Sequence, residues 1–356
     1  MREKSDTFFP WANLRFVQAL RMRPQRFNII SGKMMRVGII GAGHIAEKTA
    51  FTLLRMSDMT CGAVASRSLE KAQAFASRYS IPKAYGSYGD LLDDPEVDLV
   101  YIALPHSLHY GITKEALLKG KPCLVEKPFM LNAGEAKEIL EISRERGVFV
   151  AEAIYTRYLP AVDIIRRDIA SGVIGKVRTI SATLSYEMSS KERILSPELG
   201  GGALLDIGIY GINFVLAYGG SPIVRTSSLC TKFPTGPDMS DSISFALEDG
   251  TVAHVLTSAV CQGDNIGVIA GTKANLWIDD INNPKLIRIY AKHHELLDEH
   301  TVPSQISGFE YELRACRDAI SEGKTEPSQM PHKETLNVME IMDSLRKEWG
   351  VAFPGE

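Results

Sequence analysis

Short apolar runs alternate with helical patterns along the first half of the chain. The runs MRVGII, MTCGAVAS, VDLVYIAL, KPCLVEK and VFVAEA read as buried strands. Between them, segments such as LEKAQAFASRY and AGEAKEILEISRERG carry apolar residues at helical spacing. Strand–helix–strand units need right-handed crossovers, which place helices on both faces of a parallel sheet. We therefore expect residues 34–154 to form a doubly wound α/β domain.

The rhythm changes after about residue 155. A helical pattern, AVDIIRRDIASG, leads into a long strand, KVRTISATLSYEM, and then a helix opened by glycines. Several β-rich runs with short turns follow between residues 224 and 291, which indicates antiparallel pairing. Residues 155–356 are expected to form an α+β domain with a large, mostly antiparallel open sheet. Its two closing helical patterns can pack back onto the first domain.

Composition excludes several classes of protein. Forty basic and forty-three acidic residues leave the 356-residue chain with a net charge of −3, which argues against nucleic acid as a partner. The five cysteines, Cys61, Cys123, Cys230, Cys261 and Cys316, are scattered, so we expect neither a disulfide framework nor a metal site. A reducing, cytoplasmic location fits them. No uninterrupted apolar run reaches the roughly 18 residues that a membrane span requires.

Residues 1–33 differ from the rest, with seven Lys or Arg and only Glu3 and Asp6 as acids. An Arg-rich, acid-poor leader is typical of organelle targeting, although the apolar segment of a secretory signal is missing. The alternative is a dispensable upstream extension, because Met34 and Met35 directly precede the first strand.

The turn GAGHIA follows the first strand and predicts a dinucleotide-binding Rossmann domain. Gly41 permits a tight turn, Gly43 lets the backbone approach a pyrophosphate, and Ala46 is small where helix meets strand. His44 and Ile45 open the helix, whose N–H groups would face the phosphates.

The end of the second strand favours NADP(H) over NAD(H). An acid that would bond the ribose 2′-hydroxyl is usual at this place in NAD-preferring sites. Here the chain has Ser66 and Arg67, and a guanidinium beside a hydroxyl suits a 2′-phosphate. The alternative is that Arg67 is merely a solvent-exposed residue at a helix start.

Two further segments carry candidate chemistry. LVEKPF sets Lys127 at the end of a buried strand, and the following proline directs its backbone toward extended geometry. In GGGALLDIGIYGINF, Asp206 and Tyr210 are spaced i, i+4, so they project from one helix face. Taken alone, Lys127 can be a solvated strand end, and Asp206 can simply brace a buried tyrosine.

These motifs together resemble the glucose-fructose oxidoreductase / inositol dehydrogenase family over nearly all of residues 35–356. The resemblance rests on GIIGAGHIA, YIALPHSLHY, VEKPF, EAIYTRYLPA, GGALLDIGIYGINF and GVAFPGE in a fixed order. Within the family, the chain looks most like the branch of trans-1,2-dihydrobenzene-1,2-diol dehydrogenase and NADP-dependent D-xylose dehydrogenase.

The resemblance implies catalytic roles. Lys127 would sit beside the nicotinamide and the substrate hydroxyl, Tyr210 would transfer the proton, and Asp206 would orient the substrate or the lysine. Alcohol oxidation needs a group that takes the hydroxyl proton as hydride leaves carbon. A nearby ammonium stabilises a tyrosinate, so we expect Lys127 to lower the pKa of Tyr210.

The resemblance also implies the surroundings of the site. Tyr155 would line the substrate pocket where the branch usually has tryptophan, and Lys127–Pro128 is expected to be a cis peptide. His106 is set aside, because many relatives have asparagine there. The remaining implied cofactor contacts are Leu104, Pro105, His109, Glu126, Lys127 and Arg157.

Three functions are compatible with these residues. The leading interpretation is an NADP(H)-dependent dehydrogenase of a sugar, polyol or vicinal diol, assembled as a homodimer or homotetramer through the open sheet face. A non-catalytic dinucleotide sensor is opposed by the intact set of Lys127, Asp206 and Tyr210. An NAD-dependent glycosidase would need further acid–base groups and is disfavoured by Arg67.

Overall fold

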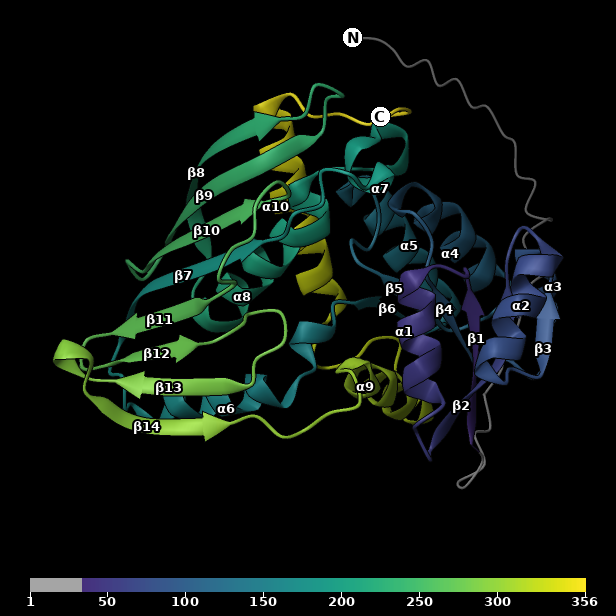
Figure 1. Cartoon of the computed structure of the whole chain (residues 1–356), viewed down its shortest axis with the longest axis horizontal. Helices are drawn as coiled ribbons and strands as arrows, with labels where there is room; N and C mark the ends of the chain where they lie inside the picture. Colours follow the sequence, from purple (N-terminus) through teal and green to yellow (C-terminus); the bar gives the residue numbers. More distant parts are fainter. Residues whose placement is uncertain (1–33) are drawn as a thin grey trace, which may run out of the picture.

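The computed structural model describes residues 34–356, so the leader expected at residues 1–33 lies outside it. Two sheets lie side by side, each with its own helices (Figure 1). The first sheet has six strands: β1 (Met35–Ile40), β2 (Met59–Ala65), β3 (Lys83–Tyr85), β4 (Leu99–Ile102), β5 (Cys123–Glu126) and β6 (Val150–Ala153).

All six strands of the first sheet are parallel, in the order β3-β2-β1-β4-β5-β6. The strands β4, β5 and β6 are buried at every position, as expected for a sheet covered on both faces. The covering helices are α1 (His44–Leu53), α2 (Leu69–Tyr79), α3 (Tyr88–Asp93), α4 (His109–Leu118) and α5 (Ala133–Arg146). The doubly wound prediction is confirmed.

The second sheet has eight strands in the order β14-β13-β12-β11-β7-β10-β9-β8. Its strands are β7 (Val177–Ser185), β8 (Ile223–Lys232), β9 (Asp238–Leu247), β10 (Val252–Ser258), β11 (Gly267–Gly271), β12 (Asn275–Ile278), β13 (Leu286–Tyr290) and β14 (Leu296–Thr301). Every pairing is antiparallel except that of β7 with β10. That parallel pair arises because the chain leaves β7 through a helix before the β8-β9-β10 meander returns beside it.

Helices cover one face of the second sheet, the face turned toward the first domain (Figure 1). These helices are α6 (Pro160–Ser171) and α8 (Ile209–Gly219), and the short α7 (Glu192–Leu195) lies between the sheet and the first domain. Gly211 lets α8 approach β10 closely, because a Cβ at this position would lie 2.4 Å from Val255 Cγ1. The helical stretch Pro197–Gly219 is long and apolar enough to cross a membrane, but 83% of that window is buried in the protein. We therefore interpret it as a core helix.

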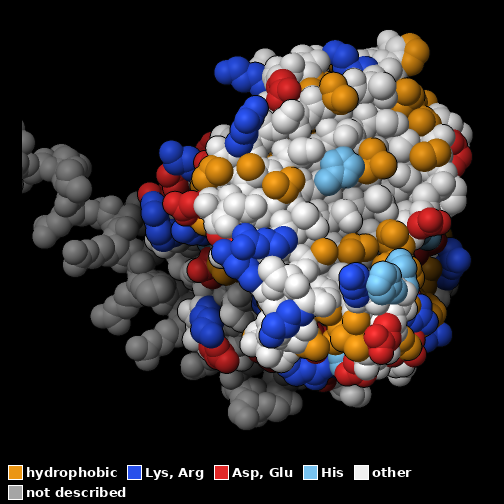
Figure 2. All heavy atoms as spheres, turned by 90° about the vertical axis from the view of Figure 1, so that its left-hand side faces the viewer, with side chains coloured by type: hydrophobic (Ala, Val, Ile, Leu, Met, Phe, Trp, Pro, Cys, Tyr) orange, Lys and Arg blue, Asp and Glu red, His pale blue; other side chains and the backbone are white. Residues whose placement is uncertain are grey.

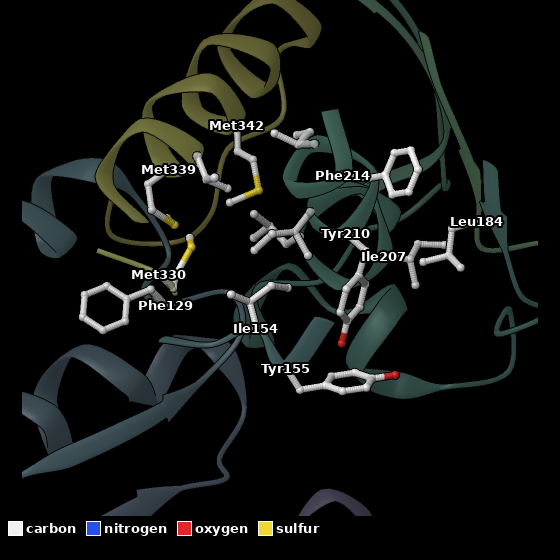
Figure 3. Packing of buried hydrophobic residues seen from close by; sticks show 14 of the residues in the cluster. Phe129, Ile154, Tyr155, Leu184, Ile207, Tyr210, Phe214, Met330, Met339 and Met342 are labelled. Atoms are coloured by element: carbon white, nitrogen blue, oxygen red, sulfur yellow. The ribbon is translucent and has the colours of Figure 1, made fainter. Parts of the chain in front are cut away.

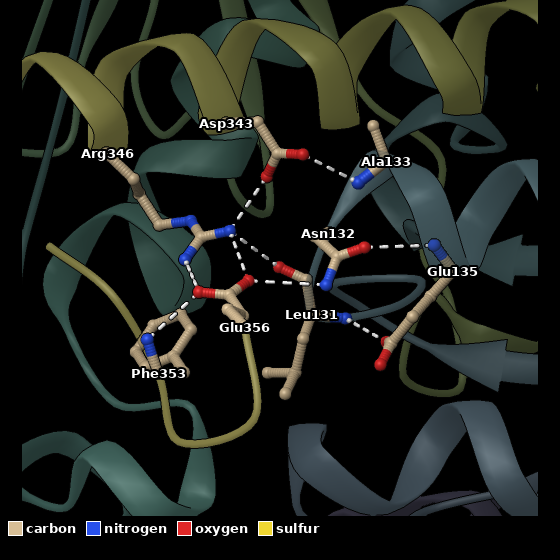
Figure 4. A network of polar contacts seen from close by, with 8 residues as sticks. All are labelled: Leu131, Asn132, Ala133, Glu135, Asp343, Arg346, Phe353 and Glu356. Atoms are coloured by element: carbon tan, nitrogen blue, oxygen red, sulfur yellow. Dashed lines mark hydrogen bonds and ion pairs between the residues drawn. The ribbon is translucent and has the colours of Figure 1, made fainter.

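The last two helices, α9 (Phe309–Ser321) and α10 (His332–Trp349), contact the first domain: α9 packs on α1 and α10 on α5. Polar contacts reinforce the second of these (Figure 4). Arg346 of α10 binds the Glu356 carboxylate at 2.7 and 2.8 Å and donates to the Leu131 carbonyl at 3.2 Å. Asp343 accepts from the Ala133 backbone N–H at 2.8 Å. The chain that follows Lys127 is thereby tied to the second domain.

Candidate active site

A tight turn after β1 begins the candidate cofactor site. Gly41 has φ +115°, and a Cβ there would lie 2.2 Å from the Ala103 carbonyl oxygen, so no other residue fits without movement. Its N–H donates to the Ala65 carbonyl at 2.9 Å, which fixes the turn to the end of β2. Ala46 is fully buried where α1 meets the sheet.

The start of α1 is open. Gly43 precedes the helix, no side chain caps it, and a Cβ on Gly43 would meet nothing within 4 Å. The next two residues, His44 and Ile45, are exposed. Uncapped N–H groups at a helix start favour an anion, and the space beside Gly43 allows a close approach. These residues fit the pyrophosphate of a dinucleotide.

Ser66 and Arg67 follow β2 at the same edge of the sheet. The Ser66 N–H donates to the Tyr85 carbonyl at 3.1 Å, and Ser68 caps α2. Arg67 is exposed and forms no ion pair with any residue in the described range 34–356. Its guanidinium is therefore free to meet a phosphate.

Lys127 directly follows β5, and its side chain reaches across to the second domain. Its peptide bond to Pro128 is cis, as the sequence resemblance implied. The ammonium donates to the Asp206 carbonyl at 2.5 Å and to Asp206 Oδ1 at 2.8 Å. The same Nζ lies 5.2 Å from the centre of the Tyr210 ring. The structure thus brings Lys127, Asp206 and Tyr210 together from two domains.

Asp206 lies in a wide, π-helical turn, η4 (Leu204–Gly208), that runs directly into α8. Wide turns of this kind are frequent at functional sites. Asp206 and Tyr210 are both buried, at 5% and 9% exposure. Tyr210 lies in the first turn of α8, and its ring lies edge-on to Tyr155 with 6.1 Å between centroids (Figure 3).

Arg193 is a second cation on Asp206 that the sequence reasoning missed. It lies on α7, and its Nη1 is 2.6 Å from Asp206 Oδ1. Burial alone would raise the pKa of Asp206, but the charges of Lys127 and Arg193 outweigh it and hold that pKa below its usual range. Asp206 therefore stays ionised between the two cations. In the sequence, the only sign of Arg193 was the charged segment Lys191-Glu192-Arg193, which precedes the glycine run at residues 200–202.

The expectation that Lys127 lowers the pKa of Tyr210 is wrong for this structure. Burial raises the pKa of Tyr210 well above its ordinary value, and Tyr155, Glu126 and Asp206 add to that effect. The ammonium of Lys127 is engaged by Asp206 instead. Tyr210 is consequently a neutral phenol at neutral pH, which makes it a proton donor.

An aromatic and amide wall lines the other side of Tyr210. Tyr155 donates to Asn282 Oδ1 at 2.9 Å, and Asn282 Nδ2 donates to the Tyr186 hydroxyl at 3.3 Å. Tyr155 starts the turn η2 (Tyr155–Arg157), while Asn282 comes from the loop after β12. No motif in the sequence pointed to Asn282 or Tyr186. The hydrogen-bonded chain fixes the orientation of Tyr155, which the resemblance places at the substrate.

Two histidines brace the site from the first domain. His106 Nδ1 donates to the Gly200 carbonyl at 2.8 Å, and burial lowers the pKa of His106 to about 3, so the ring is neutral. His109 is fully buried, with its ring nitrogens 2.9 Å from the Pro128 carbonyl and 3.0 Å from the Leu104 carbonyl. These contacts support the loop around Lys127. Pro105, the residue between Leu104 and His106, is exposed.

Two residues that the resemblance assigned to the cofactor, Arg157 and Glu126, form contacts with other residues of the chain instead. Arg157 is buried, pairs with Glu334 and donates to the Asn213 carbonyl at 3.4 Å. Glu126 is buried and accepts from the Tyr101 hydroxyl, and burial raises its pKa. These contacts favour structural roles for Arg157 and Glu126, and their contact with a cofactor stays a prediction.

The fold and the site together define a dinucleotide-binding oxidoreductase. Residues 35–154 match the model of the oxidoreductase family with an NAD-binding Rossmann fold, and residues 162–277 match the GFO/IDH/MocA C-terminal domain. The chain belongs to this family.

Curated relatives narrow the comparison. A trans-1,2-dihydrobenzene-1,2-diol dehydrogenase from Sus scrofa is 32% identical over 329 residues, which cover 90% of this chain and 98% of that protein. The enzyme of the same name from Xenopus tropicalis is 33% identical over 328 residues, covering 89% and 98%.

Solved structures share the whole architecture. A 3-ketoreductase from Actinomadura kijaniata, in complex with NADP and TDP-benzene, has a TM-score of 0.80 at 24% identity, covering 88% of this chain and 98% of that one. An aldose-aldose oxidoreductase from Caulobacter crescentus, complexed with glycerol, has a TM-score of 0.81 at 20% identity, covering 88% and 97%. At these identities the likeness supports the fold.

Proposed function

We propose that this chain is an NADP(H)-dependent oxidoreductase that interconverts a secondary alcohol and a carbonyl on a sugar, polyol or vicinal diol. The observation that carries the proposal is the meeting of Lys127 and Asp206, 2.8 Å apart across the two domains, beside the buried phenol of Tyr210. Fixed charges and a proton donor in one desolvated site are what carbonyl reduction requires.

Each side chain has a defined task in this proposal. The nicotinamide, when bound, accepts or donates the hydride. Lys127 stabilises negative charge on the substrate oxygen, and Asp206 fixes the lysine in place. Tyr210, neutral because of its burial, donates its hydroxyl proton to that oxygen in reduction and regains a proton in oxidation.

The preference for NADP(H) rests on Arg67. Its exposed guanidinium at the end of β2 forms no ion pair within residues 34–356 and suits a 2′-phosphate. The end of β2 carries no acidic residue that would repel such a phosphate. The complex of the Actinomadura ketoreductase with NADP is consistent with this choice.

The substrate class rests on the wall of the pocket. Tyr155, Asn282 and Tyr186 offer a hydrogen-bonded mixture of ring faces and polar atoms, which suits a small ring carrying hydroxyl groups. The curated relatives are diol dehydrogenases, and the fold neighbour from Caulobacter is an aldose oxidoreductase.

The open face of the second sheet is the proposed surface for a homodimer or homotetramer. Charged side chains gather toward its edges, while its middle is largely uncharged (Figure 2). Exposed apolar residues on β8 and β10 include Val224, Leu229, Val252 and Leu256. A broad uncharged face on a soluble fold is typical of a contact with a second copy.

An activity screen tests the function. The protein is incubated with NADP⁺ or NAD⁺ and a panel of pentoses, hexoses, inositols and cyclic diols, and reduced cofactor is followed by absorbance. We expect turnover with NADP⁺ in clear preference to NAD⁺. An Arg67→Asp variant should reverse that preference, whereas turnover of the unaltered protein mainly with NAD⁺ would refute the role of Arg67.

A second variant tests the chemistry separately. Lys127→Met should lower kcat by about 100-fold or more, because a buried charge that acts on the reacting oxygen is removed. Full activity in this variant would contradict the catalytic assignment.

A further inference from the structure

Asp238, at the start of β9, touches the helical segment that carries Asp206 and Tyr210. Its Oδ2 accepts from the Leu204 backbone N–H at 2.5 Å, two residues before Asp206. The segment η4 has no side-chain cap of its own. A carboxylate supplied by a residue 34 positions further along the chain therefore occupies the place of a helix cap.

Asp238 lies so close to the preceding glycine turn that a side chain at position 202 would collide with it. Gly202 has φ +112°, and a Cβ there would lie 2.2 Å from Asp238 Oδ1. The glycine turn thus gives Asp238 room to reach the amide beyond it. On the first-domain side, the turn is held by His106, whose Nδ1 lies 2.8 Å from the Gly200 carbonyl oxygen. Contacts at Gly200 and at Leu204 therefore hold both ends of the glycine turn from which the helix bearing Asp206 and Tyr210 begins.

Asp238 is wholly buried, and a second buried acid lies close to it. Asp241, also on β9, is 1% exposed and lies close enough to Asp238 for the two carboxyl groups to interact electrostatically. Burial raises the pKa of Asp238, and burial and then the charge of Asp238 raise the pKa of Asp241 well above its ordinary value. Asp241 also accepts from the Thr257 hydroxyl at 3.3 Å. No cation in residues 34–356 forms an ion pair with either acid.

We infer that Asp238 is a positioning residue that sets the helix bearing Asp206 and Tyr210 against Lys127. The inference rests on the proposed function for its kinetic consequence. Its structural consequence, an ordered start to η4, is independent of which substrate the enzyme uses.

Matched variants separate this role from general stability. Asp238→Ala removes the acceptor of the Leu204 N–H. Asp238→Asn keeps an acceptor oxygen for that N–H, and Asp241→Asn changes the neighbouring acid but leaves Asp238 in place, so both serve as conservative controls. Hydrogen exchange at residues 200–212 reports the helix start without any need for turnover.

We expect Asp238→Ala to speed exchange at the Leu204 amide roughly tenfold, the effect of losing a helix cap. Its kcat should fall about tenfold or more with the Kd for NADP⁺ unchanged, since the cofactor turn lies in the other domain. Both conservative variants should stay near the unaltered protein. Unchanged exchange at residues 200–212 in Asp238→Ala would overturn the inference.

The two proposals fail in different ways. An unaltered protein that turns over no substrate would count against the proposed function, while the exchange experiment would still decide the role of Asp238. Exchange that rises equally in peptides of β1 to β6 would show a general loss of stability and also overturn the positioning role.

Discussion

Lys127 and Asp206 are 79 residues apart and belong to different domains, yet their charged groups lie 2.8 Å apart. The carboxylate is shared with Arg193, whose Nη1 is 2.6 Å from the same oxygen. Two cations on one buried carboxylate make the relative position of the domains part of the site, because Lys127 cannot move without leaving its partner.

Replacing Arg193 should change how the enzyme responds to acid. Arg193→Gln removes one of the two charges that hold the pKa of Asp206 low, so that pKa rises. Asp206 must be ionised to hold Lys127, and activity is lost as pH falls through its pKa. The acid limb of kcat should therefore move to higher pH. Lys191→Gln removes an exposed charge two residues away and should leave the profile unchanged; equal profiles for all three proteins would contradict this role.

Replacing Tyr155 should affect the substrate and spare the cofactor. Tyr155→Phe breaks the hydrogen bond to Asn282 and frees the amide that also contacts Tyr186. A lost hydrogen bond of this kind corresponds to roughly 2- to 10-fold in KM. Tyr158→Phe is the matched control, since its hydroxyl donates to the Glu152 carbonyl at 3.2 Å instead. A larger change in the Kd for NADP⁺ than in KM would argue against the pocket assignment.

Glu152 on β6 should make stability depend on pH. Burial raises the pKa of Glu152 from 4.5 to about 8. The native protein then keeps a proton that the unfolded chain releases, so stability falls as pH rises from about 4.5 to about 8. Glu152→Gln cannot lose that proton. Relative to the unaltered protein, its free energy of unfolding should gain a few kcal/mol between pH 5 and pH 8.

Urea unfolding at several pH values measures this difference, with exposed Glu145→Gln as the control. Parallel pH curves for Glu152→Gln and the unaltered protein would show that Glu152 is already ionised in the native state.

The parts of the fold that follow from local pattern could be read from the sequence. The strand β4 consists of apolar and aromatic residues, all buried, and the helix α2 begins and ends at the predicted residues. β3 and α3 were missed. β3 has only three residues, all half-buried, and α3 is a six-residue helix in which apolar and acidic residues are mixed. The parallel pairing of β7 with β10 depends on the path of the chain through α8, which no local pattern records.

The candidate site divides in the same way. The glycine turn, Lys127, Asp206 and Tyr210 stood in recognisable motifs. Arg193 and Asp238 act through partners that only the folded chain brings near. Arg157 was assigned to the cofactor because of its motif, but a glutamate 177 residues away pairs with it in the structure.

The most direct test of the account is the rate of carbonyl reduction by Tyr210→Phe, measured with NADPH and the best substrate of the screen. Tyr218→Phe is the control, because that tyrosine is also buried on α8 but contacts Phe214 rather than Lys127. We predict a fall in kcat of about 100-fold or more for Tyr210→Phe, with cofactor affinity unchanged. Equal rates for the two variants would contradict the proton-donor role of Tyr210.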